Sequence, residues 1–291
     1  MSGVFSLLHE NLQKALTARN WQPTPIQNSA IPEIINGKSR LLIAPTGSGK
    51  TLSAILPILH RCIAEDWQPL SVLYITPLRA LNRDVDRRLQ EIADSVGLRV
   101  GLRHGDTTQS ERAKQVRKPP HILVTTPETF QLMFTGKNLR KLLATVKAVI
   151  VDEVHDLAAS ERGWQLSVGL ARLEALSGEK VQRIGLSATV GNPQQVAKWL
   201  SDDGEAIIET GKRVTEIFVE TEFPTSEDET GGIEYAIPSR AHAIFRQVIS
   251  IIEKDAPCLL FVNSRSDAET IANRLQKMAP ALEIGVHHGS L

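Results

Sequence analysis

Residues 44–51 read Ala-Pro-Thr-Gly-Ser-Gly-Lys-Thr and directly follow the short apolar run RLLIA at 40–44. A helical pattern of apolar residues then runs from Thr51 to Ala64. A glycine-rich loop between a buried strand and a helix lets backbone N–H groups wrap phosphates, with the positive end of the helix pointing at them. The sequence therefore predicts a nucleotide-binding loop whose contact residues are Thr46, Gly47, Ser48, Gly49, Lys50 and Thr51.

Two side chains at the end of this loop have separate roles in that prediction. Lys50 is long enough to reach the β and γ oxygens of a nucleoside triphosphate, and the Thr51 hydroxyl is suited to ligate Mg²⁺. Ala44 replaces the first glycine of the usual pattern. The alternative is a glycine-rich turn that binds nothing. The pattern favours ATP and Mg²⁺ as cofactors.

Short runs rich in Val, Ile and Leu recur on both sides of the loop, at 40–44, 71–76, 121–126, 146–151 and 182–187. Helical patterns separate them, at 51–64, 78–96, 110–117 and 164–176. Continuous apolar runs are typical of strands buried on both faces, and their alternation with helices is typical of a doubly wound parallel sheet. We therefore predict an α/β fold with such a sheet over residues 1–210.

The pattern changes at 222–238, where EFPTSEDETGGIEYAIP combines proline, an acidic cluster and two adjacent glycines. These features predict a linker and surface loop over 211–238. The α/β alternation then restarts, with helical patterns at 240–253 and 266–278 and strand patterns at 257–263 and 282–288. We expect 239–291 to be the start of a second, incomplete domain of the same type.

Composition excludes several classes of protein. The 291 residues are 42% hydrophobic and 23% charged, so largely disordered and fibrous classes are excluded. With 33 basic and 33 acidic residues, net charge gives no sign of a nucleic-acid partner. The two cysteines lack metal-ligand spacing, and no apolar run is long enough to span a membrane. We expect no membrane partner and a cytoplasmic location.

An acidic pair follows another predicted strand. Asp152-Glu153-Val154-His155 comes directly after the run 146–151. Open α/β sheets bind ligands at the carboxyl ends of their strands. Asp152 is therefore a candidate Mg²⁺ ligand, direct or through water, and Glu153 a candidate base for an attacking water. A polar strand end without function is the alternative.

Gln27 ends the stretch Trp21-Gln-Pro-Thr-Pro-Ile-Gln, 23 residues before Lys50. A glutamine amide pairs bidentately with N6 and N7 of adenine, which would select ATP over GTP. A Pro-Thr-Pro turn that opens a helix over 26–35 explains the same residues equally well.

Three further strand ends are followed by a hydroxyl and then by proline or a small residue. They read Thr76-Pro77-Leu78-Arg79, Thr125-Thr126-Pro127-Glu128 and Ser187-Ala188-Thr189. Hydroxyls, helix N-termini and arginine contact sugar and phosphate without reading bases. Taken singly, each turn is better explained as a helix cap. Taken together, the three turns share a pattern that helix capping alone explains less well, and they are suited to sugar and phosphate contacts.

Six segments resemble, in order and spacing, motifs I, Ia, Ib, II, III and IV of superfamily 2 helicases. They are APTGSGKT, TPLRAL, TTPE, DEVH, SAT and FVNSRS. DEVH is similar to the DExH group, and the stretch from 152 to 176 resembles the large helicase-related (Lhr) family. The resemblance implies two RecA-like domains that bind ATP between them, grip a single strand and move 3′ to 5′. It implies catalytic roles for Lys50, Asp152, Glu153 and His155, and coupling of nucleotide state to strand grip by His155, Ser187 and Thr189. It implies backbone contacts by Pro77, Arg79, Thr126, Asn263, Ser264 and Arg265.

The chain departs from that family in one respect. No Gln-x-x-Gly-Arg-x-x-Arg segment lies between Arg265 and Leu291. We therefore expect this chain to lack the arginine finger of the second domain and the accessory domains that the resemblance implies. We expect the chain to bind ATP but to turn it over poorly. The alternatives are a non-catalytic scaffold that binds ATP and nucleic acid, and a P-loop kinase or GTPase, in which Gln27 and the SAT turn would have no place.

Overall fold

The structure is a computed structural model that describes residues 3–77, 89–158, 160–209, 223–255 and 257–287. The chain divides into two compact units, Met1–Arg213 and Val214–Leu291.

The first unit is built on a seven-stranded sheet in the order β3-β4-β2-β5-β6-β1-β7, and every recorded strand pair is parallel. Its strands are β1 Arg40–Ile43, β2 Val72–Ile75, β3 Val100–Arg103, β4 Ile122–Thr125, β5 Ala148–Val151, β6 Gln182–Ser187 and β7 Glu205–Ile208. The predicted doubly wound parallel sheet is confirmed. The five predicted runs form the five central strands. The edge strands β3 and β7 escaped prediction because they are only partly buried and lack an apolar run.

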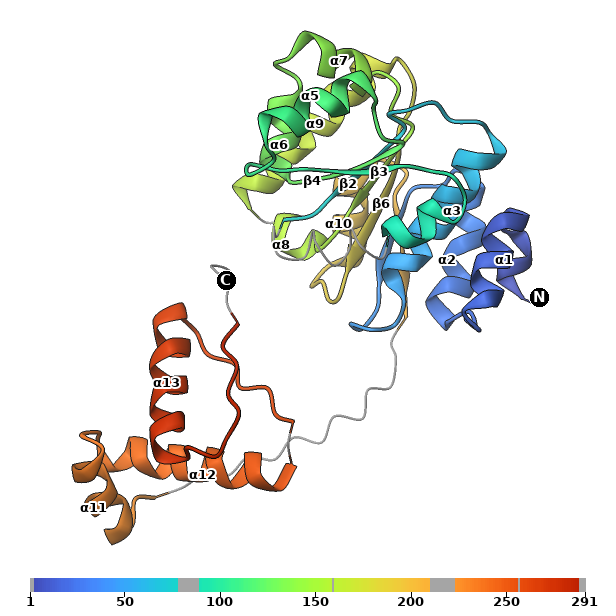
Figure 1. The fold of residues 1–291 in the computed structure, drawn as a ribbon. Helices are drawn as coiled ribbons and strands as arrows, with labels where there is room; N and C mark the ends of the chain where they lie inside the picture. Colours follow the sequence, from blue (N-terminus) through green and yellow to red (C-terminus); the bar gives the residue numbers. More distant parts are fainter. Residues whose placement is uncertain (1–2, 78–88, 159, 210–222, 256, 288–291) are drawn as a thin grey trace. The chain divides into compact units, whose positions relative to one another are not determined.

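Helices cover both faces of this sheet (Figure 1). In the first unit they are η1 Val4–Leu7, α1 Glu10–Ala18, α2 Pro25–Ile35, α3 Lys50–Ala64, α5 Gln109–Arg117, α6 Pro127–Met133, α7 Lys137–Leu143, α8 Val154–Ala158, α9 Glu161–Ser177 and α10 Pro193–Leu200. Residues 89–94 are also helical, and the earlier part of the helix predicted at 78–96 lies outside the described residues. No helix in the described part of the chain is both long and apolar enough to span a bilayer.

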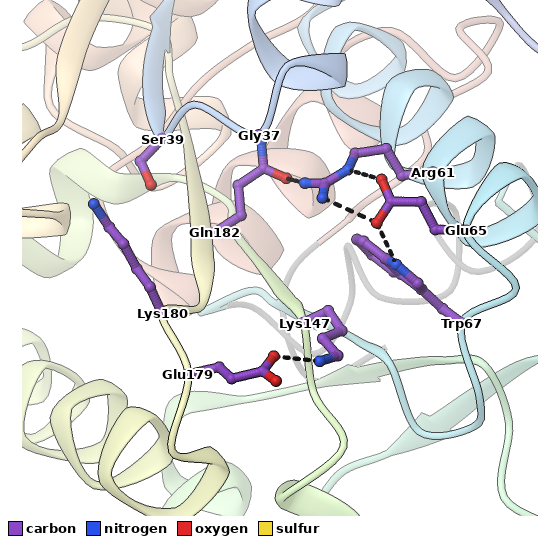
Figure 2. A pocket seen from close by; sticks show the side chains of 9 residues that line it. All are labelled: Gly37, Ser39, Arg61, Glu65, Trp67, Lys147, Glu179, Lys180 and Gln182. Carbon is purple, nitrogen blue, oxygen red and sulfur yellow. Dashed lines mark hydrogen bonds and ion pairs between the residues drawn. The ribbon is translucent and has the colours of Figure 1, made fainter.

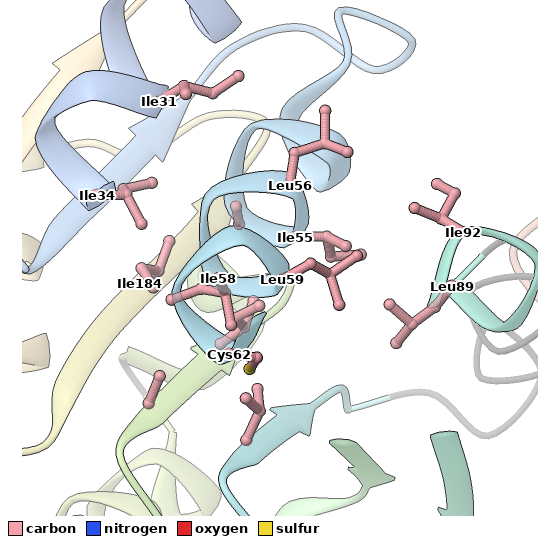
Figure 3. Close-up of a cluster of buried hydrophobic side chains, with 14 of the residues drawn as sticks. Ile31, Ile34, Ile55, Leu56, Ile58, Leu59, Cys62, Leu89, Ile92 and Ile184 are labelled. Carbon is pink, nitrogen blue, oxygen red and sulfur yellow. The ribbon is translucent and has the colours of Figure 1, made fainter. Parts of the chain in front are cut away.

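Strand alternation divides the core into two layers. Leu42 points to the layer under α2 and α3, and its neighbour Leu41 points to the layer under α6, α8, α9 and α10. Figure 3 shows Ile58 of α3 on the side of Ile34 of α2, whereas Ile55 and Leu59 lie on the side of Leu89 and Ile92. Each such buried aliphatic side chain contributes about 1.5–3 kcal/mol. This packing holds both ends of the glycine-rich loop, where β1 ends and α3 begins.

The second unit contains α11 Ser226–Glu234, α12 Ser239–Asp255 and α13 Arg265–Met278. Helix α11 corrects the prediction of a surface loop at residues 226–234, and residues 211–222 of the predicted linker lie outside the described residues. Thr225 and Asp228 form a capping box at its start, and the acidic cluster lies in its first turn, where carboxylates complement the helix dipole. Asp228 is fully buried and also receives hydrogen bonds from His242 and Arg246 of α12.

Two predicted strands in this unit are also wrong. Residues 257–263 and 282–287 are not assigned to any strand. A strand needs a neighbouring strand to satisfy its backbone groups, and within the described residues of this unit neither segment has one. As a result Leu259 and Phe261 are 86% and 88% exposed. The apolar pattern is real, but the sheet that would bury it is not formed by these residues.

Candidate nucleotide-binding site

The glycine-rich loop leaves the carboxyl end of β1 and leads into α3. Gly47 and Gly49 have φ values of +80° and +93°, a conformation that side chains other than glycine rarely adopt. A Cβ atom on Gly49 would also lie 2.6 Å from Nε2 of Gln27. Both glycines are therefore required by the shape of the loop. Ser48 contributes a buried Oγ that has no hydrogen-bond partner among the described residues, so it is available to a ligand.

Lys50 lies at the first turn of α3 and reaches back over the loop. Its Nζ donates to the carbonyl oxygens of Ala44 at 2.5 Å and Pro45 at 3.0 Å. Burial lowers the pKa of Lys50, and the charges of Glu153 and Asp152 act in the opposite direction. The loop lysine and the acidic pair, which lie a hundred residues apart in sequence, therefore belong to one electrostatic site.

The acidic pair is held at the carboxyl end of β5. The backbone N–H of Asp152 donates to the carbonyl of Ile75 at 2.8 Å, which continues the β2–β5 ladder. Asp152 Oδ1 accepts from the N–H of Glu153 at 2.9 Å. Glu153 has a φ of +47°, an uncommon conformation for a residue with a side chain and one that is found at functional sites.

Burial sets the proton affinity of both carboxylates. It raises the pKa of Asp152, partly offset by the hydrogen bond from Tyr74. It also raises the pKa of Glu153, and the neighbouring charge of Asp152 raises it further. A carboxylate with a raised pKa is a better general base than an ordinary glutamate. The arrangement suits Glu153 for accepting a proton from water.

Tyr74 of β2 completes this cluster and was not predicted. It is fully buried, and its hydroxyl donates to Asp152 Oδ2 at 2.5 Å. Thr51 lies close enough to the phenol to lower its pKa, against the larger effect of burial. Burial, followed by the charge of Asp152, raises the pKa of Tyr74 well above its usual value, so the phenol remains a donor. A tyrosine in an otherwise aliphatic strand was the signal available in the sequence.

The residues present fit a Mg²⁺ ion that arrives with a nucleotide. Thr51 and Asp152 both lie beside the phenol of Tyr74, which donates to Asp152. Within the described residues, no group of three or more His, Cys, Asp or Glu side chains could hold a metal alone. Mg²⁺ at nucleotide sites takes one or two protein oxygens and completes its shell with phosphate and water. One hydroxyl and one carboxylate match that need.

His155 and the SAT turn meet beside the acidic pair. His155 Nδ1 lies 3.0 Å from Ser187 Oγ at the end of β6, and 3.4 Å from Glu153 Oε2. Ser187 Oγ also lies 3.1 Å from the carbonyl of Thr189, to which it donates. The three residues predicted to couple nucleotide state to strand grip are therefore in contact. The coupling itself stays a prediction.

The Gln27 amide joins the start of α2 to the glycine-rich loop. Oε1 accepts from the N–H of Thr24 at 3.0 Å, which forms the capping box of α2, and Nε2 donates to the carbonyl of Gly49 at 3.3 Å. Gln27 is 3% exposed. Gln27 thus takes part in the N-terminal cap of α2, as the alternative explanation of this stretch expects. The prediction that Gln27 reads adenine remains a prediction.

The strand-end turns at β2 and β4 are linked by an arginine that sequence analysis missed. Arg162 of α9 donates to the carbonyl of Pro77 at 3.1 Å and pairs with Glu128 Oε1 at 2.6 Å. Thr126 is buried and caps α6, accepting from the N–H of Thr129 at 3.3 Å. The helix-cap explanation of this turn is therefore observed. Arg79 lies outside the described residues.

The remaining predicted contacts belong to the second unit. Ser264 caps α13 by accepting from the N–H of Asp267 at 3.0 Å and donating to its carboxylate at 2.7 Å. Asn263 precedes the cap and Arg265 is the first residue of α13. Their predicted role in binding nucleic acid remains a prediction.

A separate pocket of about 480 Å³ opens at the other edge of the sheet, where β1, β5 and β6 begin. None of the predicted site residues lines it. Figure 2 shows two ion pairs in its lining, Arg61 with Glu65 and Lys147 with Glu179. Lys180, which also lines it, pairs with Asp203 outside the pocket.

A parallel α/β sheet with a phosphate-binding loop after β1 and an acidic pair after β5 defines a P-loop NTPase with a RecA-like fold. The DEAD/DEAH box helicase family matches residues 24–196, and this chain belongs to that family.

Several relatives resemble the chain over nearly its whole length. The ATP-dependent helicase Lhr-Core protein 2 of Thermococcus barophilus is 37% identical over 99% of the chain, which spans 36% of that relative. The ATP-dependent helicase Lhr-Core of Methanothermobacter thermautotrophicus is 36% identical over 92% of the chain and 33% of its own length. The chain thus spans about a third of the length of these curated relatives.

A solved structure agrees with this assignment. The Mycobacterium smegmatis helicase Lhr bound to ssDNA and AMP-PNP has a TM-score of 0.76 and 33% identity, over 95% of this chain and 36% of that one. The predicted resemblance to Lhr helicases is confirmed.

Proposed function

We propose that this chain is part of the core of a DExH-type, ATP-dependent helicase that couples ATP hydrolysis to 3′ to 5′ movement along single-stranded nucleic acid. The observation that supports it most is the meeting of Lys50, the Asp152–Glu153 pair and the His155–Ser187 contact at one edge of the sheet. A nucleotide-binding scaffold would have no need of a buried base with a raised pKa.

Each residue of the site has a chemical task in this proposal. The loop N–H groups and Lys50 would hold the phosphates of ATP, and Thr51 with Asp152 would hold Mg²⁺, which neutralises phosphate charge when bound. Glu153 would orient the attacking water and accept its proton. The contact between His155 and Ser187 would transmit the state of the site to the turns that follow β6 and β4.

The proposed partner is a single strand gripped through its backbone. The solved Mycobacterium smegmatis Lhr is described as bound to ssDNA and AMP-PNP, which supports the same pair of ligands here. On the first unit the proposed contacts are Pro77, Arg79 and Thr126, and on the second they are Asn263, Ser264 and Arg265. Backbone contacts of this kind do not distinguish bases.

Binding of AMP-PNP tests the proposal directly. Lys50→Ala should weaken the affinity of the chain for AMP-PNP by about 10- to 100-fold, because charge-assisted bonds to phosphate are lost. Calorimetry with Mg²⁺ present measures this. Equal affinities of the variant and the parent would rule out the loop as the nucleotide site.

Phosphate release separates a helicase from a scaffold. It should be measured in the full-length protein with single-stranded DNA, single-stranded RNA and an RNA–DNA hybrid in parallel. Stimulation by one of them is expected of a translocating motor, whereas an unstimulated rate would favour the scaffold. The substrate that stimulates most identifies the nucleic acid.

Arg162 should contribute to single-strand binding through the two turns that it joins. Removing it with Arg162→Ala should lower affinity for a labelled oligonucleotide by about tenfold, because two hydrogen bonds that hold Pro77 and Glu128 in place are lost. Fluorescence anisotropy at two salt concentrations measures the change.

Arg172→Ala is the matched control for this variant. Arg172 also lies on α9, and its guanidinium stacks on Phe134, 4.4 Å from the ring centroid. Both variants remove one positive charge from the same helix, so their general electrostatic effects should match. If the two variants bind the oligonucleotide equally well, Arg162 has no role in positioning the turns.

A further inference from the structure

We infer that Tyr74 is a positioning residue for the metal-binding side of the nucleotide site, and that its hydroxyl sets the geometry in which Thr51 and Asp152 would hold Mg²⁺. The inference rests on the proposed function and adds to it a residue from a strand that the motifs do not include. The observation behind it is a single buried phenol that donates to the Asp152 carboxylate and lies beside Thr51.

The carboxylate of Asp152 is held at both oxygens. Oδ1 accepts from the N–H of Glu153 at 2.9 Å, and Oδ2 accepts from the Tyr74 hydroxyl at 2.5 Å. The second distance lies at the short end of the range for a hydroxyl bonded to an ionised carboxylate. Two bonds from two different directions leave the carboxylate a single orientation, with one lone pair on each oxygen still available.

Thr51 and Asp152 come from different elements. Thr51 lies in the first turn of α3, Asp152 follows β5, and Tyr74 on β2 touches both. Without the phenol, the relative position of the hydroxyl and the carboxylate would depend on α3 and β5 alone. Outer partners of this kind orient metal ligands and typically change metal affinity by about 10- to 100-fold when removed.

The ring of Tyr74 is itself fixed. Its exposure is 0%, it packs in the core layer beneath α3, and it lies opposite Ile150 in the β2–β5 register. The substitution Tyr74→Phe keeps this packing and removes only the hydroxyl. It therefore tests the hydrogen bonds without opening a cavity in the core.

The first experiment compares AMP-PNP affinity with excess Mg²⁺ and with a chelator. In the parent chain Mg²⁺ should strengthen binding, and in Tyr74→Phe that gain should fall about tenfold while affinity in chelator stays the same. Ser71→Ala is the matched control. Ser71 directly precedes β2 and also has a buried hydroxyl, but this hydroxyl donates to the His121 carbonyl. The Ser71→Ala variant should keep the full Mg²⁺ gain.

The outcomes separate the inference from the proposed function. A parent chain that does not bind AMP-PNP would overturn both. A parent that gains affinity with Mg²⁺, together with a Tyr74→Phe variant that gains equally, would overturn only the role of Tyr74. A loss shared by Ser71→Ala would show that strand packing, rather than the phenol, is responsible.

A second measurement does not depend on the folding of the variant. The chain has only two tyrosines, so fluorotyrosine labelling gives two ¹⁹F resonances, from Tyr74 and Tyr235. Tyr235→Phe identifies the Tyr74 line by removing the other. Adding Mg²⁺ to the AMP-PNP complex should shift the Tyr74 line, because the carboxylate to which it donates changes its electronic environment. An unshifted Tyr74 line would overturn the inference.

Discussion

The 291-residue chain should hydrolyse ATP roughly 10³ to 10⁵ times more slowly than a longer version of the protein that supplies an arginine finger. The residues after Arg265 contain no Gln-x-x-Gly-Arg-x-x-Arg segment, which is the segment expected to supply that arginine. The missing arginine corresponds to about 4–7 kcal/mol of transition-state stabilisation. Nucleotide binding should persist, because Lys50, Thr51 and Asp152 all lie in the first unit.

The measurement is phosphate release by the chain and by the full-length protein side by side, each saturated with single-stranded nucleic acid. AMP-PNP affinity serves as the control that both bind nucleotide. Strong nucleic-acid-stimulated turnover by the 291-residue chain would contradict the prediction. In that case Arg265→Ala would show whether this arginine completes the site.

Glu153→Gln should retain nucleotide binding and lower hydrolysis in the full-length protein by about 10²- to 10⁴-fold, the usual contribution of a positioned general base. The amide keeps the size of the side chain but cannot accept a proton. Glu179→Gln is the matched control, because Glu179 pairs with Lys147 at the opposite edge of the sheet. It should leave the rate unchanged.

The pH dependence of the same rate gives an independent check. Burial raises the pKa of Glu153, so its basic form is lost at a higher pH than in an ordinary glutamate. As pH falls, the rate should therefore begin to fall above the usual glutamate range near about 4.3. If the fall in rate at low pH is the same in Glu153→Gln as in the wild type, a group other than Glu153 causes it.

Some of the site could be predicted because its signals are local. The glycines of the loop, the helix start at Lys50 and the acidic pair after an apolar run each need only a few neighbouring residues to be recognised. The start of α11 was equally local, since Thr225 and Asp228 have capping-box spacing, but the proline and glycines around them favoured a loop.

The amino-acid sequence by itself determined the central strands, the phosphate-binding loop and the acidic pair, because hydrophobic runs and glycine conformations act over short stretches of chain. Only the tertiary structure decided that Tyr74 bonds to Asp152, 78 residues away, and that Arg162 reaches Pro77, 85 residues away. The same is true of the edge strands β3 and β7, which pair with β4 and β1 although they are only partly buried. Such contacts depend on which strands become neighbours in the sheet, and strand order is set by the packing of the whole unit.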